Sequence, residues 1–236
     1  MTPPTGRKKR GGPRPHNRHE RALGEEGFGT VAGLDEVGRG AWAGPVSVGV
    51  VVFPPGIRAP RGLADSKLLA EERREALYPL IIGWCADWSV GHADPEECDR
   101  WGMTAALRLA ARRALGGLRC PPHAVLMDGN FDYVTEPASP DDPFARPAPP
   151  PDGLPSPHIR TVVRGDAACV SIAAASIVAK VTRDRMMRGM ASSFPAFDFD
   201  RNKGYPSPTH RTALAGFGLT SVHRRSWSFV DEMAFR

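Results

Sequence analysis

The chain has 236 residues and a mass of 25.5 kDa, with 41% hydrophobic residues, 24% charged residues and a net charge of +5. This apolar content suits one sizeable core, and the length is too small for two full domains. No stretch approaches about 18 consecutive apolar residues, and the first 21 residues are basic and polar where a signal peptide would be apolar. We therefore expect a cytoplasmic protein that neither spans a membrane nor is secreted.

Cysteine usage also argues against secretion. No C-x-x-C pair and no group of spaced histidines accompanies the four cysteines, which are Cys85, Cys98, Cys120 and Cys169. This pattern indicates neither a zinc ribbon nor a disulfide scaffold. We expect reduced and mostly structural thiols.

The positive charge is concentrated at the N-terminus. Residues 1–21 contain seven basic residues and one acidic residue, and the rest of the chain is close to neutral. Prolines and glycines interrupt this segment without any apolar periodicity, so we expect a disordered basic tail over residues 1–27. The tail is either a salt-sensitive arm for nucleic acid or a solvated extension, and its composition favours neither.

The first half of the chain predicts strands that alternate with helices. Two apolar runs, separated by a glycine-rich segment, predict a pair of strands at 28–34 and 46–53. Apolar positions among charged residues predict a helix over 68–82. A short strand at 88–92 and a strongly amphipathic helix at 103–115 follow.

The second half continues this order around one interruption. A strand at 124–127 is followed by nine prolines within 135–157, which exclude regular structure and predict an exposed insertion. A strand at 159–163 then leads into a helix at 167–187, whose many Ala and Ser residues allow close packing against a sheet. With a last helical stretch around 210–217, the pattern predicts an α/β domain with a mixed sheet.

Acidic residues follow or precede these elements at three places. Asp35 and Glu36 close the first strand, Asp128 closes another, and Asp166 lies directly before the long helix. Singly, Asp166 is an ordinary helix cap and Asp128 an ordinary turn residue. Together, four converging carboxylates would repel one another unless divalent cations bind, and oxygen ligands without Cys or His favour Mg²⁺ or Mn²⁺.

Such a site suits hydrolysis of a phosphodiester. Two ions about 4 Å apart would stabilise both the attacking water and the leaving oxygen. One geometric condition concerns Asp35 and Glu36, because adjacent strand residues point to opposite faces of a sheet. Both serve one site only if the chain turns there or if one of them contributes its backbone carbonyl.

Sequence blocks along the chain resemble the motifs of one enzyme family. They run in the family's order: GLDEVGRG at 33–40 followed by AGPV at 43–46, DSK at 65–67, MDGN at 127–130, RGD at 164–166, AAASIVAKVTRD at 173–184, KGYP at 203–206 and HRRS at 223–226. The chain resembles the type 2 ribonucleases H, specifically bacterial ribonuclease HII, over nearly all residues outside the tail.

The resemblance implies a fold and an activity. The fold is ribonuclease H-like, a five-stranded mixed sheet flanked by helices with a C-terminal helical extension, in a catalytic domain over residues 28–236. The activity is endonucleolytic: cleavage of the RNA strand of RNA–DNA hybrids and nicking 5′ to a ribonucleotide in duplex DNA, leaving 3′-hydroxyl and 5′-phosphate ends. Two Mg²⁺ or Mn²⁺ ions would serve as cofactors. We expect a monomer, and no motif for a sliding clamp is found.

The same resemblance assigns the site residues. The catalytic and metal-binding carboxylates fall on Asp35, Glu36, Asp128 and Asp166, and the substrate-recognition element falls on Gly38, Arg39, Gly40 and Tyr205. Residues without a Cβ let the backbone approach a 2′-hydroxyl closely, and an aromatic ring can stack on a sugar. Lys67 and Lys180 are either phosphate contacts or solvated surface lysines.

Some further residues carry weaker expectations. His210 is expected to be a packed or capping histidine near the cleft. Arg224 and Arg225 could reach the duplex backbone. The proline-rich insertion lengthens the spacing from Asp128 to Asp166, so the strand after it must re-enter the sheet in register.

Three rival functions are distinguished by sequence features. Ribonuclease HIII resembles this family but has a substantial domain before its Asp-Glu motif and lacks Gly-Arg-Gly, whereas 34 residues precede Asp35 here. A non-catalytic module that binds nucleic acid would have lost at least one of the four carboxylates. A metal-dependent phosphatase for small phosphate esters would gain nothing from Gly38, Arg39, Gly40 and Tyr205.

Overall fold

The computed structural model describes residues 14–135 and 153–230, which fold around one five-stranded sheet with the strand order β3-β2-β1-β4-β5. The strands are β1 (Val31–Val37), β2 (Val46–Val52), β3 (Asp87–Ala93), β4 (Ala124–Asp128) and β5 (His158–Val162). The first three form an antiparallel meander, while β4 pairs parallel to β1 and β5 pairs parallel to β4. The predicted α/β fold with a mixed sheet is confirmed.

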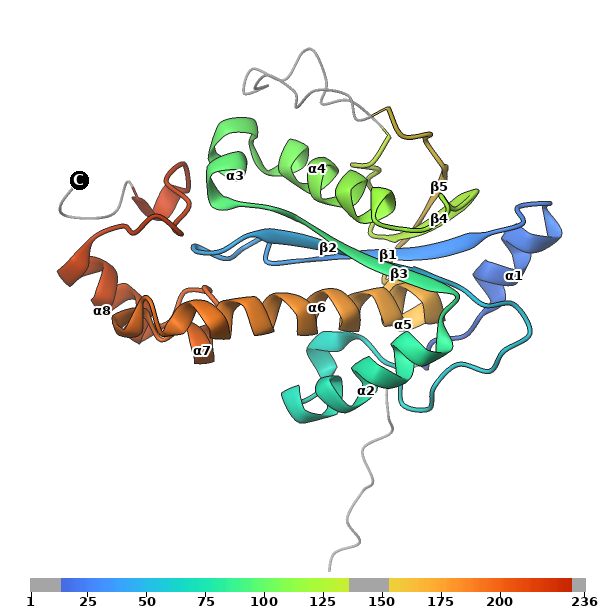
Figure 1. Cartoon of the computed structure of the whole chain (residues 1–236), viewed down its shortest axis with the longest axis horizontal. Coiled ribbons are helices and arrows are strands. Elements are labelled where there is room, and N and C mark those ends of the chain that lie inside the picture. Colours follow the sequence, from blue (N-terminus) through green and yellow to red (C-terminus); the bar gives the residue numbers. More distant parts are fainter. Residues whose placement is uncertain (1–13, 136–152, 231–236) are drawn as a thin grey trace, which may run out of the picture.

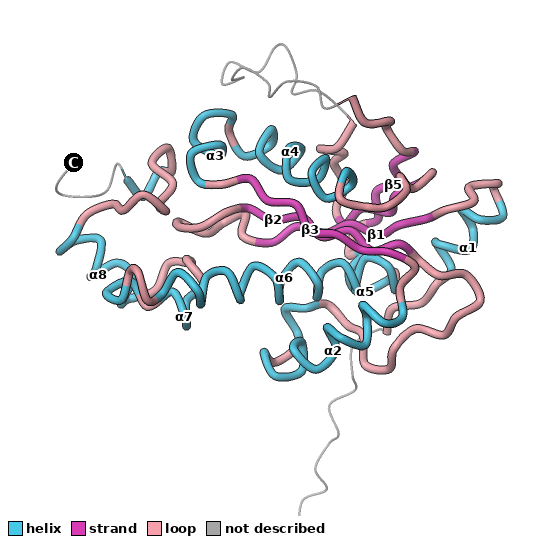
Figure 2. The backbone as a smooth tube through the Cα atoms, in the orientation of Figure 1, coloured by secondary structure: helices cyan, strands magenta, loops and turns pink. Residues whose placement is uncertain are grey.

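Helices cover both faces of the sheet (Figure 1). One face carries α3 (Pro95–Trp101) and α4 (Met103–Gly116), and the other carries α2 (Glu71–Trp84), the short α5 (Gly165–Ala168) and the long α6 (Val170–Ala191). Figure 2 shows the strands lying between these two helical layers. At one end of the molecule, α7 (Phe199–Asn202) and α8 (Pro208–Phe217) form the predicted C-terminal helical extension.

Close packing of α6 against the central strands follows from small residues on both sides. A Cβ on Gly33 of β1 would lie 2.1 Å from the backbone carbonyl carbon of Ser171, and one on Gly49 of β2 would lie 2.7 Å from the carbonyl oxygen of Ala175. Real atoms do not approach that closely, so glycine is required at both positions. The Ala-rich helix predicted from the sequence therefore packs directly on the sheet.

The predicted disordered tail is partly wrong. Residues 18–25 form helix α1 (Arg18–Glu25), and its Leu23 is fully buried against Val31 and Ile172. Glu20 is 1% exposed and accepts hydrogen bonds from the backbone N–H and the hydroxyl of Ser171 at 2.9 and 2.7 Å. These contacts attach the segment to the domain, and residues 1–13 of the expected tail lie outside the described residues.

The insertion does not displace the strand that follows it. Residues 136–152 of the proline-rich segment lie outside the described residues, yet β5 pairs with β4 along its whole length, with Asp128 opposite Val162. Asp166 is thereby delivered to the edge of the sheet where β4 ends. The four cysteines are free, as predicted. Among the described residues, no helix has the length and apolarity that a membrane crossing requires.

Candidate active site

Three of the four predicted carboxylates lie on the face of the sheet that carries α6. Asp35 follows Gly33 on β1 with the same orientation, toward α6, and Asp128 follows Leu126, which packs against Ile172 of α6. The parallel register pairs Leu34 with Met127, so the next residues, Asp35 and Asp128, lie side by side.

Asp166 joins these two carboxylates from helix α5. The backbone N–H of Gly165 donates a hydrogen bond to Oδ1 of Asp128 at 2.7 Å, which fixes the start of α5 against the end of β4. A Cβ on Gly165 would lie 2.4 Å from the side chain of Ile172, so this close approach also depends on glycine. The structure therefore brings Asp35, Asp128 and Asp166 together at one edge of the sheet.

Glu36 approaches from the opposite face. Strand β1 continues to Val37, so the chain does not turn between Asp35 and Glu36, and the carboxylate of Glu36 accepts a hydrogen bond from Tyr133 at 3.3 Å. Even so, the pKa of Glu36 is raised, first by burial and then by the charge of Asp128, with Arg39 opposing this effect. Glu36 therefore joins the other three carboxylates from beyond the end of β4, without a turn in the chain.

Burial and mutual repulsion both disfavour the charged forms of these acids. The pKa of Asp35, which is 3% exposed, is raised well above its usual value, first by burial and then by the charge of Glu36. Burial, followed by the charges of Asp128 and Asp65, raises the pKa of Asp166 to about 6. The fold therefore concentrates negative charge without supplying enough positive charge to balance it.

Two basic residues that the sequence singled out, Arg39 and Lys67, lie beside this group, and the guanidinium of Arg39 is 3.9 Å from the carboxylate of Glu36. The 3-10 turn η1 (Ser66–Leu68) begins with the carboxylate of Asp65 accepting from the backbone N–H of Lys67 at 2.8 Å, and the ammonium of Lys67 lies 3.9 Å from Asp166. Partial burial disfavours its charged form, but the charges of Asp35, Asp65 and Asp166 outweigh this and raise the pKa of Lys67. Its side chain is 72% exposed, so it remains available to a ligand.

The donor chemistry of the site fits a hard divalent cation. The candidate ligands are carboxylates only, two of them (Asp35 and Asp166) are buried, and one exposed lysine with one exposed arginine cannot neutralise four acids. As they stand, no three His, Cys, Asp or Glu side chains of the described residues are arranged to hold a metal ion. The fit therefore rests on the chemistry and charge of the carboxylates.

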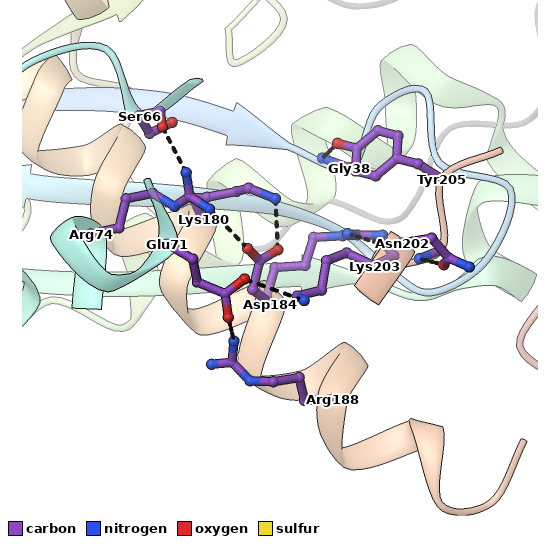
Figure 3. Close-up of polar contacts among 12 residues, drawn as sticks. Gly38, Ser66, Glu71, Arg74, Lys180, Asp184, Arg188, Asn202, Lys203 and Tyr205 are labelled. Carbon is purple, nitrogen blue, oxygen red and sulfur yellow. Dashed lines mark hydrogen bonds and ion pairs between the residues drawn. The ribbon is translucent and has the colours of Figure 1, made fainter. Parts of the chain in front are cut away.

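The predicted recognition residues meet on a neighbouring surface. The backbone N–H of Gly38 donates to the hydroxyl of Tyr205 at 3.1 Å, which joins two segments 167 residues apart (Figure 3). Gly38 has φ +84°, and a Cβ there would lie 2.3 Å from Nε of Arg183. Both the backbone conformation and the available space demand glycine at this position.

Lys180 lies near Tyr205 but is already paired. Its ammonium is 5.8 Å from the centre of the Tyr205 ring and 2.7 Å from Asp184, which also faces Arg74 at 3.7 Å (Figure 3). Burial lowers the pKa of Lys180, and Asp184 opposes the effect. A phosphate contact by Lys180 therefore has to compete with Asp184.

Two buried arginines donate hydrogen bonds to backbone carbonyls within and next to the recognition segment. Arg183 donates to the carbonyls of Pro45, Lys203 and Ala43 at 2.8, 2.8 and 3.0 Å. The expectation that Arg224 could reach duplex backbone is wrong: the residue is 0% exposed, and its guanidinium donates to the carbonyls of Gly44 and Arg39.

His210 has the packed role predicted for it. Its Nδ1 lies 3.0 Å from the carbonyl oxygen of Tyr205, and its Nε2 lies 2.9 Å from Nε2 of His223. A carbonyl only accepts, so Nδ1 of neutral His210 carries the proton and its Nε2 accepts from His223. Nδ1 of His223 then accepts from the backbone N–H of Thr220 at 3.0 Å. The pair holds the turn that carries Tyr205.

Known proteins show the same sequence pattern and fold. The family model Ribonuclease HII matches residues 32–230. Ribonuclease HII of Streptomyces griseus subsp. griseus is 50% identical over 211 residues, covering 88% of this chain and 80% of that protein. Ribonuclease HII of Paracoccus denitrificans is 45% identical over 214 residues, covering 91% and 92%.

A solved structure agrees. The crystal structure of ribonuclease H2 from Pyrococcus horikoshii OT3 matches with a TM-score of 0.67 and 26% identity, covering 86% of this chain and 96% of that one. The matched segment contains the carboxylate edge and the Gly38–Tyr205 contact described above. The chain therefore belongs to the ribonuclease HII family, ribonuclease H hydrolases that act on the RNA of RNA–DNA hybrids.

Proposed function

We propose that this enzyme nicks duplex DNA on the 5′ side of an embedded ribonucleotide, in addition to cleaving RNA–DNA hybrids, and leaves 3′-hydroxyl and 5′-phosphate ends. One observation carries the proposal: the carboxylate edge on β1, β4 and α5 adjoins the contact between Gly38 and Tyr205. A site that cuts any phosphodiester would need only the first of these parts. The second part offers backbone and hydroxyl groups suited to recognising a single 2′-hydroxyl.

The four carboxylates are the proposed ligands of two Mg²⁺ or Mn²⁺ ions. Bound ions would supply Lewis-acid activation of water and stabilise charge on the leaving oxygen. Asp35 occupies the middle of the group, because its charge interacts with both Glu36 and Asp128. Asp166 and Lys67 form the outer side, where an exposed ammonium 3.9 Å from a carboxylate can contact a phosphate oxygen.

The recognition segment provides specificity in this proposal. Gly38, Arg39 and Gly40 present backbone to the ribonucleotide, and the ring of Tyr205 packs against its sugar. The hydroxyl of Tyr205 already accepts from the N–H of Gly38 and can still donate its own proton to a 2′-oxygen. Discrimination against DNA follows because a 2′-deoxy sugar offers no partner for these groups.

The test is a nicking assay on a DNA duplex that contains one ribonucleotide, with Mg²⁺ or Mn²⁺. We expect a single nick 5′ to the ribonucleotide and none in an all-DNA duplex of the same sequence. The Asp35→Asn variant should bind the duplex without cutting it.

Two results would contradict the proposal. Nicking of the all-DNA duplex at a comparable rate would refute recognition of the 2′-hydroxyl. Cleavage of long RNA–DNA hybrids without cleavage at a single ribonucleotide would restrict the enzyme to hybrids. The monomeric state and the cytoplasmic location expected from the sequence stay predictions.

A further inference from the structure

We propose that Arg224 is a positioning residue for recognition of the ribonucleotide: its buried guanidinium turns the peptide between Arg39 and Gly40 so that the N–H of Gly40 faces the substrate. The inference rests on the proposed function and concerns a residue that does not itself contact nucleic acid.

The contacts of Arg224 are directed at two carbonyls of one loop. Nη1 donates to the carbonyl of Arg39 at 3.0 Å, and Nη2 and Nε donate to the carbonyl of Gly44 at 3.1 and 3.2 Å. Among the described residues, no carboxylate forms an ion pair with Arg224, although the side chain is 0% exposed. A buried cation without a counter-ion is costly, so its hydrogen bonds to the loop must compensate for that cost.

The direction of the Gly40 N–H follows from peptide geometry. The described peptide bonds are all trans, and in a trans peptide the C=O and the next N–H point in opposite directions. Because the carbonyl of Arg39 points inward to Arg224, the N–H of Gly40 points away from the protein interior. Gly40 is exposed, and within the described part of the chain its N–H has no hydrogen-bond partner.

The peptide group between Gly38 and Arg39 also leaves its N–H unbound by any described residue. The carbonyl of Gly38 accepts from the N–H of Ala41 at 3.2 Å, and the N–H of Arg39 has no partner within the described residues. Two successive free N–H groups form a site for a ligand oxygen. Arg224 binds the peptide group between Arg39 and Gly40 directly, so it determines the direction of one of these two N–H groups.

The role requires the forked shape of arginine. The guanidinium presents several donors in one rigid plane, so it binds two carbonyls at once. A lysine keeps the charge but presents its donors from a single atom, and it cannot reproduce both bonds in the same geometry. The Arg224→Lys variant therefore separates the orientation of the loop from its charge.

The test compares Arg224→Lys with its parent in the non-cleaving Asp35→Asn background. The measured quantity is the ratio of dissociation constants for an all-DNA duplex and for the same duplex with one ribonucleotide. We expect this ratio to fall by about tenfold, the scale of one lost hydrogen bond, with the affinity for the all-DNA duplex unchanged. Arg185→Lys serves as the control, because Arg185 is an exposed arginine paired with Glu75.

Three outcomes are informative. A folded Arg224→Lys protein with the parental ratio would overturn the inference. A parent protein that binds both duplexes equally would instead refute the proposed function. If Arg224→Lys does not fold, Gly40→Pro removes the N–H in question and adds a ring at a position where no atom lies within 4 Å of an added Cβ. This variant should lower the ratio by a similar amount, and an undiminished ratio would again overturn the inference.

A second observation leads to a separate site. We infer that an open cavity of about 640 Å³ between the segment before α1 and the loop after β2 binds the phosphodiester backbone of the duplex beyond the cleavage site. This inference also rests on the proposed function. Arg14, Arg58 and Arg61 line the cavity together with His16, and no acidic residue lines it. Among the described residues, no carboxylate is paired with any of these three arginines.

The cavity is linked to the active site on two sides. Leu63 and Val170 line it, and each lies four residues along the chain from one partner of the Lys67–Asp166 contact. Four residues span at most about 14 Å, or about four base pairs of duplex. Arg14, Arg58 and Arg61 line this same cavity, and three guanidinium groups without a paired carboxylate among the described residues suit a chain of phosphates that continues from the cleavage site.

The test is the salt dependence of duplex binding by the double variant Arg58→Ala, Arg61→Ala. Each lost phosphate contact should reduce the slope of log affinity against log salt by about 0.9, so we expect a reduction of about 1.8. Arg160→Ala is the control, because it removes an arginine already paired with Glu26 at 2.7 Å. An unchanged slope would overturn the inference. Nicking at saturating duplex should persist in the double variant. If the parent protein itself does not nick the duplex, that result would count against the proposed function instead.

Discussion

Two buried polar clusters lie on either side of the end of β1, and they are built in opposite ways. In the carboxylate cluster of Asp35, Glu36, Asp128 and Asp166, like charges face one another and the pKa values of three members are raised. In the cluster around Arg183, Arg224 and His210, the nitrogens bind carbonyls of the protein itself or a second histidine.

The difference separates a surface that needs a ligand from one that holds the chain in place. An excess of negative charge is relieved only by a partner from solution, whereas a satisfied hydrogen-bond network is complete without one. The first cluster should therefore lose function and gain stability when it is neutralised. The second should lose stability when it is opened.

The largest effect is expected from Asp35→Asn. Cleavage should fall by about a thousandfold, because the proposed ions would lose a charged ligand worth several kcal/mol in the transition state. Without divalent ions, the variant should unfold at a higher temperature than the parent at pH 7, because a buried charge with a raised pKa has been removed. Thermal unfolding in the presence of a chelator measures this difference. A variant that unfolds at a lower temperature than the parent would contradict the contrast between the two clusters.

The opposite response is expected from Arg183→Met. This change leaves the carbonyls of Ala43, Pro45 and Lys203 buried without donors. We expect the free energy of unfolding to fall by about 3 kcal/mol, even though the volume of the side chain is nearly kept. Urea unfolding measures this directly. An unchanged midpoint would show that the carbonyls find other partners and that the cluster is not a rigid frame.

The carboxylate cluster could largely be predicted from the sequence, whereas the arginine cluster could not. The convergence of the four carboxylates was predicted because they lie beside predicted strand and helix ends and match family motifs, and their role as metal ligands stays a prediction. Strand β1 was nevertheless predicted to end at Leu34, whereas it continues to Val37 because Val37 pairs with Ser47. Asp and Glu disfavour strands, and strand pairing overrides that local preference.

The hydrogen bonds from buried Arg183 and Arg224 to backbone carbonyls could not be predicted from the sequence. A charged side chain is expected at the surface, and only the fold reveals which carbonyls surround it. Tyr133 was missed for a similar reason, because 97 residues separate it from Glu36. Helix α1 was missed because its basic residues obscure the one buried leucine, Leu23.

An intermediate effect is expected from pH. The pKa of Asp166 is raised from 3.8 to about 6, so the folded state holds this proton more tightly than the unfolded state does. In the metal-free protein, the contribution of Asp166 to stability should therefore decline as pH rises from about 4 through about 6. Cleavage should show the reverse and rise over the same range, because ions bind the deprotonated carboxylate.

Metal concentration provides the check on this assignment. Raising Mg²⁺ or Mn²⁺ favours the deprotonated carboxylates, so the acid limb of the pH–rate profile should move to lower pH. Rate profiles at two metal concentrations measure that shift. An acid limb that stays in place would mean that a group outside the carboxylate cluster controls it.

The smallest effect is expected from shortening the N-terminal tail, and here the structure decides where to cut. Deleting residues 1–21 would remove Glu20, which is buried and bonded to Ser171, so a loss of binding could reflect damage to the fold. Deleting residues 2–13 leaves α1 intact and removes four basic residues. We expect duplex affinity to fall at low salt and to match that of the full chain at high salt, because contacts with phosphates are screened. Titrations at several salt concentrations measure this, with Arg160→Ala as the control for loss of one surface charge. If the two proteins bind equally at every salt concentration, the tail is a solvated extension, and the positive charge that matters for the duplex lies on the folded domain.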